Sequence, residues 1–332
     1  MYVMPQLGPI RPPPETYSLL IRATKNCPWN KCHFCAAFKE EKFQIRPVEE
    51  VKEDIRAAKK VMDDIMKWAT QIGCADRVGD IARINGILWL QNDGVKSAFL
   101  QDSNSIIMKT EQLVEIIEYL YETFLTLERV SSYARAKTII KKKSDELRQL
   151  KEAGFSRLYV GLETGDDELL AYVQKGATAF EMIQAGRKAI EAGFELSEYV
   201  MPGLGGCEKW EQHATNTARV LNEINPHFIR LRTLRLAEGT LLYEKARRGE
   251  FSVQTVEGVL IEIRRFIEEL DVTSELITSD QSFNFFMGEV DGKLPEDKTK
   301  LLKSIDEALA WWRFKGEPKR NPFLGNLNQP AI

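Results

Sequence analysis

The sequence lacks the features that mark membrane, secreted and nucleic-acid-binding proteins. Its 332 residues include no apolar run long enough to cross a bilayer. The proline-rich start, residues 1–14, has no apolar core of the kind found in signal peptides. The formal net charge is only −3, which gives no electrostatic reason to expect DNA or RNA as the main partner. We therefore expect a globular protein of the cytoplasm that makes no membrane contact.

Cysteine is scarce as well, and its placement is uneven. The chain has five cysteines, and three of them, Cys27, Cys32 and Cys35, fall within nine residues. An odd count with such a group argues against a disulfide framework and for a reducing compartment. Thiolates this close together usually share a metal, because soft sulfur ligands suit zinc and iron–sulfur clusters. A closed structural site normally has four ligands, so three thiolates leave one position for something else.

The spacing of these cysteines leaves more than one metal site open. Four residues separate Cys27 from Cys32 and two separate Cys32 from Cys35, as in the first three ligands of a plant-type 2Fe–2S ferredoxin. That site would need Cys74, the nearest further cysteine. A zinc site would recruit His33 or Cys74. The density of the group argues against three unconnected buried cysteines and favours an iron–sulfur centre.

Strand and helix patterns alternate through most of the chain. Six short, mostly apolar segments predict strands: residues 17–23, 97–101, 129–134, 157–162, 195–201 and 227–233. Helical periodicity separates these segments, which predicts parallel pairing through right-handed crossovers. The first strand is followed by the cysteine loop, and the glycine-rich dinucleotide fingerprint is missing there. We predict an α/β protein whose sheet curls into a barrel or partial barrel.

The predicted elements divide the chain into three parts. An N-terminal extension covers residues 1–16, and the barrel covers residues 17–250 with a helical insertion at about 48–94. The insertion includes a second helix predicted over residues 76–90. A C-terminal helical extension and tail cover residues 251–332.

Polar residues and glycines gather where the predicted strands end. In barrels of parallel strands the chemistry lies at the carboxyl ends of the strands. These ends hold the cysteine loop, residues 102–104, Arg135, Glu163 and residues 203–206. Side chains that face the surrounding helices should be apolar, so the alternating polar ones should face the interior. This rule directs inward Tyr159, Gly161, Glu163, Arg230 and Arg232.

The cysteine loop resembles that of a known enzyme family. Cys27, Cys32 and Cys35, with the aromatic Phe34 before the third cysteine, are similar to the cluster loop of radical S-adenosylmethionine (radical SAM) enzymes. The resemblance covers roughly residues 17–250 and includes the segments FLQDSN (99–104), YVGLETG (159–165) and EYVMPGLGG (198–206). The first gap has four residues here and three in the usual loop, so this is a CX4CX2C variant. The resemblance implies a partial (β/α)6 TIM-type barrel with helices outside.

The resemblance also implies a chemistry. The three cysteines would bind a 4Fe–4S cluster, and S-adenosylmethionine would chelate the iron that lacks a cysteine. Reduction by a flavodoxin or ferredoxin would cleave S-adenosylmethionine and give a 5'-deoxyadenosyl radical, which takes hydrogen from an unidentified substrate. The reaction class, whether oxidoreductase, lyase or transferase, is left open. We expect neither a cobalamin domain before the barrel nor a second cysteine cluster.

Seven residues are implied as contacts of S-adenosylmethionine: Phe34, Asp102, Ser103, Asn104, Glu163, Gly203 and Arg232. Plainer alternatives stay open for most of them. Residues 102–104 can form an Asx-type turn that caps the next helix. Arg232 can pair internally with Glu163, and the glycine turn at Gly203 needs no ligand.

Several further residues are assigned from the sequence alone. Lys175 and His213 are expected at the solvated surface, and Cys74 and Cys207 as small core residues. Substrate contacts are expected in residues 76–94, with Trp89, and in residues 283–295. The alternative function is an iron–sulfur electron-transfer or redox-sensing protein in which Cys74 is the fourth ligand.

Overall fold

The structure, a computed structural model, describes residues 7–39, 42–280, 284 and 290–316. The chain forms two compact units. Unit 1 contains residues 1–28, 40–159 and 191–194, and unit 2 contains residues 29–39, 160–190 and 195–332. Strand β6 (Phe155–Glu163) therefore contributes residues 155–159 to unit 1 and residues 160–163 to unit 2. The boundaries of these units differ from the predicted boundaries at residues 17 and 250. The division into an N-terminal extension, a barrel and a C-terminal extension therefore stays a prediction.

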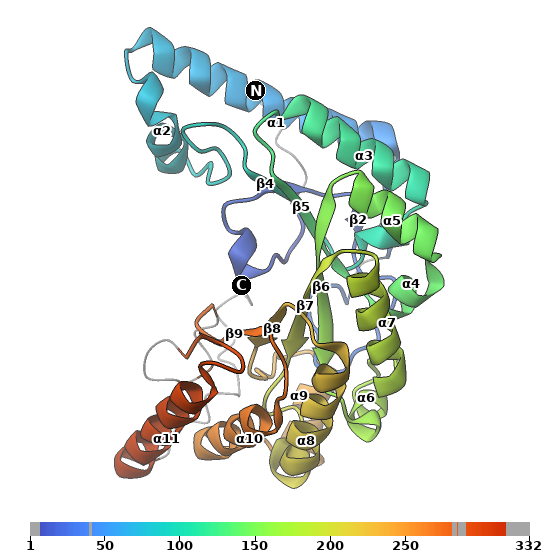
Figure 1. Cartoon of the computed structure of the whole chain (residues 1–332), viewed down its shortest axis with the longest axis vertical. Coiled ribbons are helices and arrows are strands. Elements are labelled where there is room, and N and C mark those ends of the chain that lie inside the picture. The colour runs from blue at the N-terminus through green and yellow to red at the C-terminus, as the bar shows by residue number, and fades with distance from the viewer. Residues whose placement is uncertain (1–6, 40–41, 281–283, 285–289, 317–332) are drawn as a thin grey trace. The chain divides into compact units, whose positions relative to one another are not determined.

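Unit 1 is built on parallel strands. β1 (Leu19–Ile21) pairs with β4 (Ser97–Leu100), β4 pairs with β5 (Arg129–Ala134), and β6 follows β5 in the sheet order. Helix α3 (Thr110–Thr123) lies between α1 (Val48–Gln71) and α5 (Ser144–Glu152), as Figure 1 shows. Its buried side chains recur every three or four residues and so share one face: Leu113, Ile116, Ile117 and Leu120. The short α4 (Ala136–Lys141) and the 3-10 helix η3 (Ser105–Ile107) complete the connections.

The predicted insertion is helical and belongs to unit 1. The 3-10 helix η2 (Ala75–Arg77) and helix α2 (Val78–Ile84) follow α1. A buried cluster of Ala69, Val78, Ala82 and Leu90 joins α1 to α2, and the half-buried Trp89 packs against it. The helix predicted over residues 76–90 is shorter than expected, because the chain leaves the helical conformation at Gly86, where φ is +75°.

The N-terminal segment lies along the strands of unit 1. Gly8 donates its N–H to Oε1 of Gln101, beside the end of β4, at 2.8 Å. Glu15, in the 3-10 helix η1 (Pro13–Glu15), is fully buried. It accepts hydrogen bonds from the Tyr159 hydroxyl at 2.6 Å and from Arg129 at 3.1 Å. The described part of the predicted N-terminal extension is thus bonded to the residue after β4 and to side chains of β5 and β6.

Unit 2 continues the same strand order. The end of β6 is followed by β7 (Glu195–Val200), β8 (Phe228–Leu231), β9 (Glu275–Ile277) and β10 (Gly292–Lys293). β7, β8 and β9 pair in parallel, and β10 is antiparallel to β9. Helix α10 (Val256–Glu269) lies between α8 (Gly206–Ile224) and α11 (Lys298–Lys315) (Figure 1). The remaining helices of this part are α6 (Asp167–Tyr172), α7 (Ala179–Glu191) and α9 (Leu241–Arg247).

The predicted class and strand positions are confirmed. The protein is α/β, its sheet is mostly parallel, and each of the six predicted strands overlaps an observed one. The C-terminal extension, predicted to consist of helices with an irregular stretch between them, also contains the short strands β9 and β10. Strands this short carry too little alternation to be distinguished from a loop. Within the part of the chain that the structure describes, no helix is both long and apolar enough to cross a membrane.

Candidate functional site

The cysteine loop leaves and rejoins the fold at the carboxyl end of β1. Strand β2 (Thr24–Lys25) follows β1 closely and pairs antiparallel with β3 (Gln44–Ile45). The next residue, Arg46, donates its N–H to the carbonyl of Ala23 at 3.1 Å. The residues between β2 and β3, which include all three clustered cysteines, thus form a loop that is closed at its base.

The three cysteines are half-buried and belong to different units. Cys27 lies in unit 1, whereas Cys32 and Cys35 lie in unit 2. Among the described residues, no three His, Cys, Asp or Glu side chains form a group that could hold a metal ion. Three thiols in one short loop are nonetheless a donor set that suits an iron–sulfur cluster. Their assignment as cluster ligands stays a prediction from their spacing.

Unit 1 holds the start of the loop through Asn26. The backbone N–H of Asn26 donates to Oδ2 of Asp102 at 2.6 Å, and its carbonyl accepts the Ser103 hydroxyl at 3.1 Å. The same Asp102 oxygen pairs with the Arg22 guanidinium at 2.8 Å. Burial raises the pKa of Asp102, while Arg22 and the Asn26 N–H lower it. The predicted ligand-contacting residues Asp102 and Ser103 therefore bond to the residue that precedes Cys27.

Asn104, the third residue of this segment, is also bonded within unit 1. It is fully buried, and its side-chain amide donates to Oγ1 of Thr138 at 2.8 Å. Its side-chain oxygen accepts the backbone N–H of Arg135 at 3.0 Å. Asn104 thus fixes the carboxyl end of β5, where Arg135 was predicted to lie.

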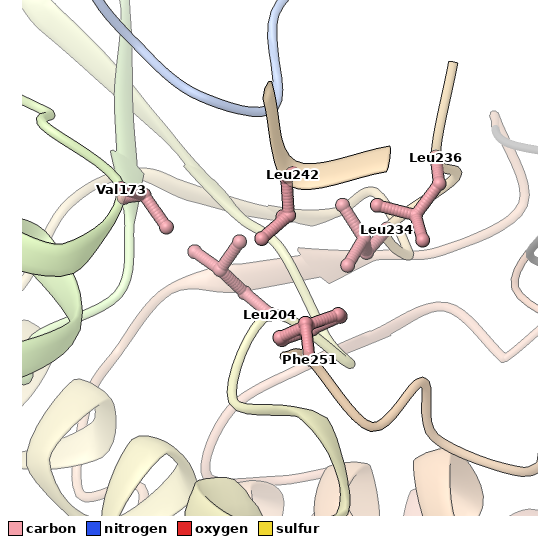
Figure 2. Close-up of a cluster of buried hydrophobic side chains, with 6 residues drawn as sticks. All are labelled: Val173, Leu204, Leu234, Leu236, Leu242 and Phe251. Atoms are coloured by element: carbon pink, nitrogen blue, oxygen red, sulfur yellow. The ribbon is translucent and has the colours of Figure 1, made fainter. Parts of the chain in front are cut away.

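Unit 2 holds the other half of the loop by backbone bonds and apolar packing. Figure 2 shows a leucine cluster made of Val173, Leu204, Leu234, Leu236, Leu242 and Phe251. Phe34, predicted to contact S-adenosylmethionine, packs against this cluster and is half-buried. The neighbouring His33 donates its N–H to the carbonyl of Val173 at 2.9 Å and accepts the N–H of Leu242 at 3.0 Å. The segment between Cys32 and Cys35 is thereby fixed to α6 and α9.

Glu163 lies in a buried charged group of unit 2. Its Oε1 accepts a hydrogen bond from Lys175 at 2.7 Å, and the two side chains are 13% and 16% exposed. Gly161 leaves the room for this pair, since a Cβ there would lie 2.2 Å from Oε1 of Glu163. The predicted surface position of Lys175 is therefore wrong, and Glu163 pairs with Lys175 and not with Arg232.

Glu198, on β7, is a third member of this group. It is 1% exposed, and Oε2 has no hydrogen-bond partner among the described residues. Burial raises its pKa well above the usual value, Lys175 lowers it and Glu163 raises it further. One lysine therefore faces two carboxyl groups, and burial favours the neutral form of Glu198.

The two arginines predicted to face inward, Arg230 on β8 and Arg232 just after it, lie near an acidic side chain. Arg230 is 4% exposed; it pairs with Asp280 and donates to the Ser197 hydroxyl at 3.2 Å. Burial raises the pKa of Asp280, and the charges of Arg230 and Arg232 lower it. Arg232 is half-buried, and its N–H donates to the Val200 carbonyl at 2.9 Å.

Gly203 is held by a buried carboxyl group. Its φ is +84°, and its N–H donates to Oε1 of Glu262 at 2.8 Å. Burial raises the pKa of Glu262 to about 8, with the Gly203 bond opposing the rise. The predicted glycine turn is thus hydrogen-bonded to a side chain of α10.

His213 lies in the same network, where it is 1% exposed, so its predicted surface position is wrong. Nε2 lies 3.1 Å from the carbonyl of Met201 and 3.4 Å from Oε1 of Glu262. Because a carbonyl only accepts, Nε2 carries the proton and Nδ1 accepts the Thr164 hydroxyl at 2.8 Å. Burial lowers the pKa of His213 to about 4, so the imidazole is neutral near pH 7.

Sequence reasoning missed Asn26, Lys175, Glu198 and His213 as parts of these networks. A signal for Glu198 was present, because an acidic residue inside an otherwise apolar predicted strand needs a partner. Nothing in the sequence marked Asn26, whose partners are 76 and 77 residues away. Cys207 was expected in the core and is exposed. Residues 283 and 285–289 of the predicted substrate segment lie outside the described residues.

Comparison with known proteins relates part of the chain to one enzyme superfamily. Residues 108–214 match the family model described as the radical SAM superfamily. The tRNA uridine(34) acetyltransferase of Methanocaldococcus jannaschii is 26% identical over 107 residues, 32% of this chain and 20% of that protein. The heme chaperone HemW of Bacillus subtilis is 28% identical over 141 residues, 42% of this chain and 37% of that protein. This chain thus matches well under half the length of these relatives.

Solved structures show similarity at low sequence identity. The crystal structure of methylornithine synthase (PylB) aligns with a TM-score of 0.48 and 14% identity, over 93% of this chain and 87% of that one. An N-terminally truncated Elp3 of Methanocaldococcus infernus aligns with a TM-score of 0.49 and 15% identity, over 74% of this chain and 59% of that one. The family match begins between β4 and β5 and ends within α8. This match and the three-cysteine loop at the end of β1 both relate the chain to the radical SAM superfamily by similarity.

Proposed function

We propose that this protein is a radical SAM enzyme that cleaves S-adenosylmethionine reductively and takes a hydrogen atom from its substrate. The superfamily uses a 4Fe–4S cluster and S-adenosylmethionine, which together supply a 5'-deoxyadenosyl radical. The thiolates of Cys27, Cys32 and Cys35 would be the protein ligands of the cluster. The observation that carries the proposal is the loop with three thiols at the carboxyl end of β1, in a chain whose residues 108–214, which include β5, β6 and β7, match the superfamily model.

The residues of the loop would exclude water from the cluster and hold its ligands. Phe34 packs on the leucine cluster, so its ring gives the Cys32–Cys35 segment an apolar support. Asp102 and Ser103 fasten the residue before Cys27. Fixed ligands with apolar surroundings support a cluster whose potential and solvent access are controlled by the protein.

The charged group of unit 2 would bind the polar end of S-adenosylmethionine. Lys175 offers an ammonium group to a carboxylate, and Glu163 offers a carboxylate to an amino or hydroxyl group. Arg232 is a second candidate for an anionic group, and Gly203 lets the backbone approach a ring closely. Asp102 and Asn104 are weaker candidates for direct contact, because their side chains already bond within unit 1.

The electron donor and the reaction class belong to the same proposal. A flavodoxin or ferredoxin would supply the electron, as the resemblance implies. Relatives act on tRNA or haem by name, but each is matched over less than half of its length. The substrate is therefore left unassigned, and the class stays between oxidoreductase, lyase and transferase.

The alternative with Cys74 as a fourth ligand has little geometric support. Helix α1 has 24 residues and is about 36 Å long at 1.5 Å per residue. Its start follows Arg46, which is bonded to Ala23 at the end of β1. Cys74 lies beyond the other end of α1, where its N–H is bonded to the carbonyl of Ala69. A ligand at that end would be far from Cys27 within unit 1.

The test is anaerobic reconstitution followed by reduction. With iron, sulfide, dithionite and S-adenosylmethionine, the protein should form 5'-deoxyadenosine, measured by liquid chromatography with mass spectrometry. Cys27→Ala, Cys32→Ala and Cys35→Ala should each lose the product, and Cys74→Ala should retain it as the matched control. If no product forms and the single substitution Cys74→Ala also abolishes the cluster, the electron-transfer alternative holds.

A further inference from the structure

We infer that Asp102 and Ser103 are positioning residues that hold the backbone of Asn26 and thereby fix the place of the Cys27 thiolate. The inference rests on the proposed function, because it concerns how the chain presents one of three proposed cluster ligands. It gives the segment after β4 a role through the cysteine loop, distinct from the contact with S-adenosylmethionine that the resemblance implies.

Every polar atom of Asn26 is bonded within unit 1. Besides the backbone bonds to Asp102 and Ser103, its side-chain amide donates to the carbonyl of Lys42 at 2.7 Å and its side-chain oxygen accepts from Arg22 at 3.3 Å. Asn26 is only 4% exposed, and its φ of +67° is a left-handed conformation that asparagine tolerates better than most residues. The backbone that leads into Cys27 is therefore fixed in position and direction.

Asp102 and Ser103 are connected to strands β1 and β4. Gln101, which precedes Asp102, donates its N–H to the carbonyl of Ile21 at the end of β1, at 2.8 Å. Asp102 is fully buried, with both Nε and a terminal nitrogen of Arg22 within 2.9 Å of Oδ2. A carboxylate that accepts a backbone N–H makes a stronger bond than a neutral acceptor does. The attachment of Asn26 thus moves only if β1 or β4 moves.

This attachment acts on one cysteine only. Once the Asn26 peptide is fixed, few rotations remain to displace the Cys27 sulfur. Cys32 and Cys35 belong to unit 2 and depend on the bonds of His33 and the packing of Phe34. Residues that orient a metal ligand from behind typically change metal affinity by about tenfold to a hundredfold when replaced. A change at Asp102 should therefore weaken the cluster through Cys27.

Three variants test this role. Asp102→Asn keeps the size of the side chain but removes its charge, so its neutral amide oxygen accepts more weakly from Arg22 and Asn26 than the carboxylate oxygen does. Ser103→Ala removes one hydroxyl that bonds to the Asn26 carbonyl. Thr138→Val is the matched control, because it removes one hydroxyl bond to Asn104 in the same unit without touching Asn26.

Two measurements apply to these variants. In the reconstituted protein, the rate of iron loss to a chelator should rise about tenfold or more for Asp102→Asn and less for Ser103→Ala. The reduced cluster should also change its electron paramagnetic resonance signal. In the metal-free protein, alkylation of Cys27 by iodoacetamide should speed up while that of Cys32 and Cys35 does not. Thr138→Val should match the wild type in all of these.

The outcomes separate the inference from the proposed function. If the wild type takes up a four-iron cluster and both loop variants keep its rate of iron loss, the positioning role is overturned. Equal effects of Thr138→Val and Ser103→Ala would also overturn it, since general loosening would then explain them. If the wild type takes up no such cluster, the proposed function fails, and the alkylation pattern alone decides whether Asp102 positions Cys27. Should Asp102→Asn not fold, Ser103→Ala carries the test.

Discussion

The two halves of the cysteine loop are held by different forces. On the side of Cys27, unit 1 uses charge: the buried Asp102 faces Arg22 at 2.8 Å and accepts the Asn26 N–H. On the side of Cys32 and Cys35, unit 2 uses apolar packing on the leucine cluster and neutral backbone bonds. Charge-assisted bonds are directional, whereas apolar contacts are not. The bonds of the first half therefore fix its orientation. The packing of the second half mainly fixes its position on the leucine cluster.

This difference predicts different sensitivities. A buried ion pair costs little when complete and much when one partner is removed. Apolar packing is lost gradually as atoms are deleted, in proportion to the cavity that remains. Substitutions in the two halves should therefore differ in pH dependence as well as in size.

The largest effect is expected for Arg22→Met. This change leaves Asp102 buried without its cation, at a cost of about 3–5 kcal/mol in the free energy of unfolding. Burial already raises the pKa of Asp102, so removal of Arg22 raises it further and the carboxyl can protonate in acid. The loss should thus shrink as pH falls, which urea unfolding at several pH values would measure. A loss that is independent of pH would contradict the charged description of this half.

Leu242→Ala should destabilise the second half by about 2–5 kcal/mol, because Leu242 is fully buried in the leucine cluster. Unlike the loss in Arg22→Met, this loss should be constant with pH. Alkylation of Cys32 and Cys35 in the metal-free protein should speed up more than that of Cys27, as peptide mass spectrometry would measure. Leu241→Ala is the control, since Leu241 is 46% exposed and its truncation should change little. Equal acceleration at all three cysteines would show that the halves are not held separately.

The sequence was sufficient for the six predicted strands and for the face of α3, because these depend on local periodicity. Burial of Leu113, Ile116 and Leu120 follows directly from their spacing. The β9–β10 pair was missed, since its residues show no alternation long enough to stand out. The periodicity of apolar residues therefore identifies a helix or strand only where that element is long enough to show it.

The site was foreseen in position but not in its bonds. Glu163 and Gly203 were identified because they follow strands, yet their partners Lys175 and Glu262 come from distant segments. Lys175 and His213 were placed at the surface because charged and polar residues usually lie there. Both are drawn inward by partners that no local pattern reveals. Pairing of buried polar groups is a tertiary property, so it needed the structure.

Glu262→Gln tests whether unit 2 also relies on charge. The pKa of Glu262 is raised from 4.5 to about 8 and that of His213 is lowered from 6.5 to about 4. Between pH 4.5 and 6.5 the folded state gains a proton at Glu262 and lacks one at His213, so their effects on stability oppose. Above pH 6.5 only Glu262 still differs, and it binds more protons when folded, so stability should fall as pH rises toward 8.

The expected fall in the free energy of unfolding over that range is at most about 2 kcal/mol. Glu262→Gln keeps an acceptor for the Gly203 N–H and should remove the part of the fall that Glu262 causes, while any part caused by the buried Glu198 stays. Glu211→Gln, on the exposed side of α8, should preserve it. Thermal unfolding from pH 6 to 9 would measure all three proteins. If the stability of the wild type rises with pH over this range, Glu262 is ionised in the folded state. Unit 2 would then rely on a buried carboxylate, as unit 1 does.

The smallest effect is expected for Phe34→Leu, which conserves the apolar character and most of the volume of a half-buried side chain. Such exchanges usually cost less than about 1.5 kcal/mol. Phe34 lies between His33 and Cys35 and packs on the leucine cluster, so the change should loosen only the second half of the loop. Alkylation of Cys35 should rise slightly and that of Cys27 should not, whereas Ser103→Ala should give the reverse pattern. If Phe34→Leu accelerates the alkylation of Cys27 as much as that of Cys35, the apolar packing and the charged bonds do not hold the two halves independently. The contrast between the two halves would then be wrong.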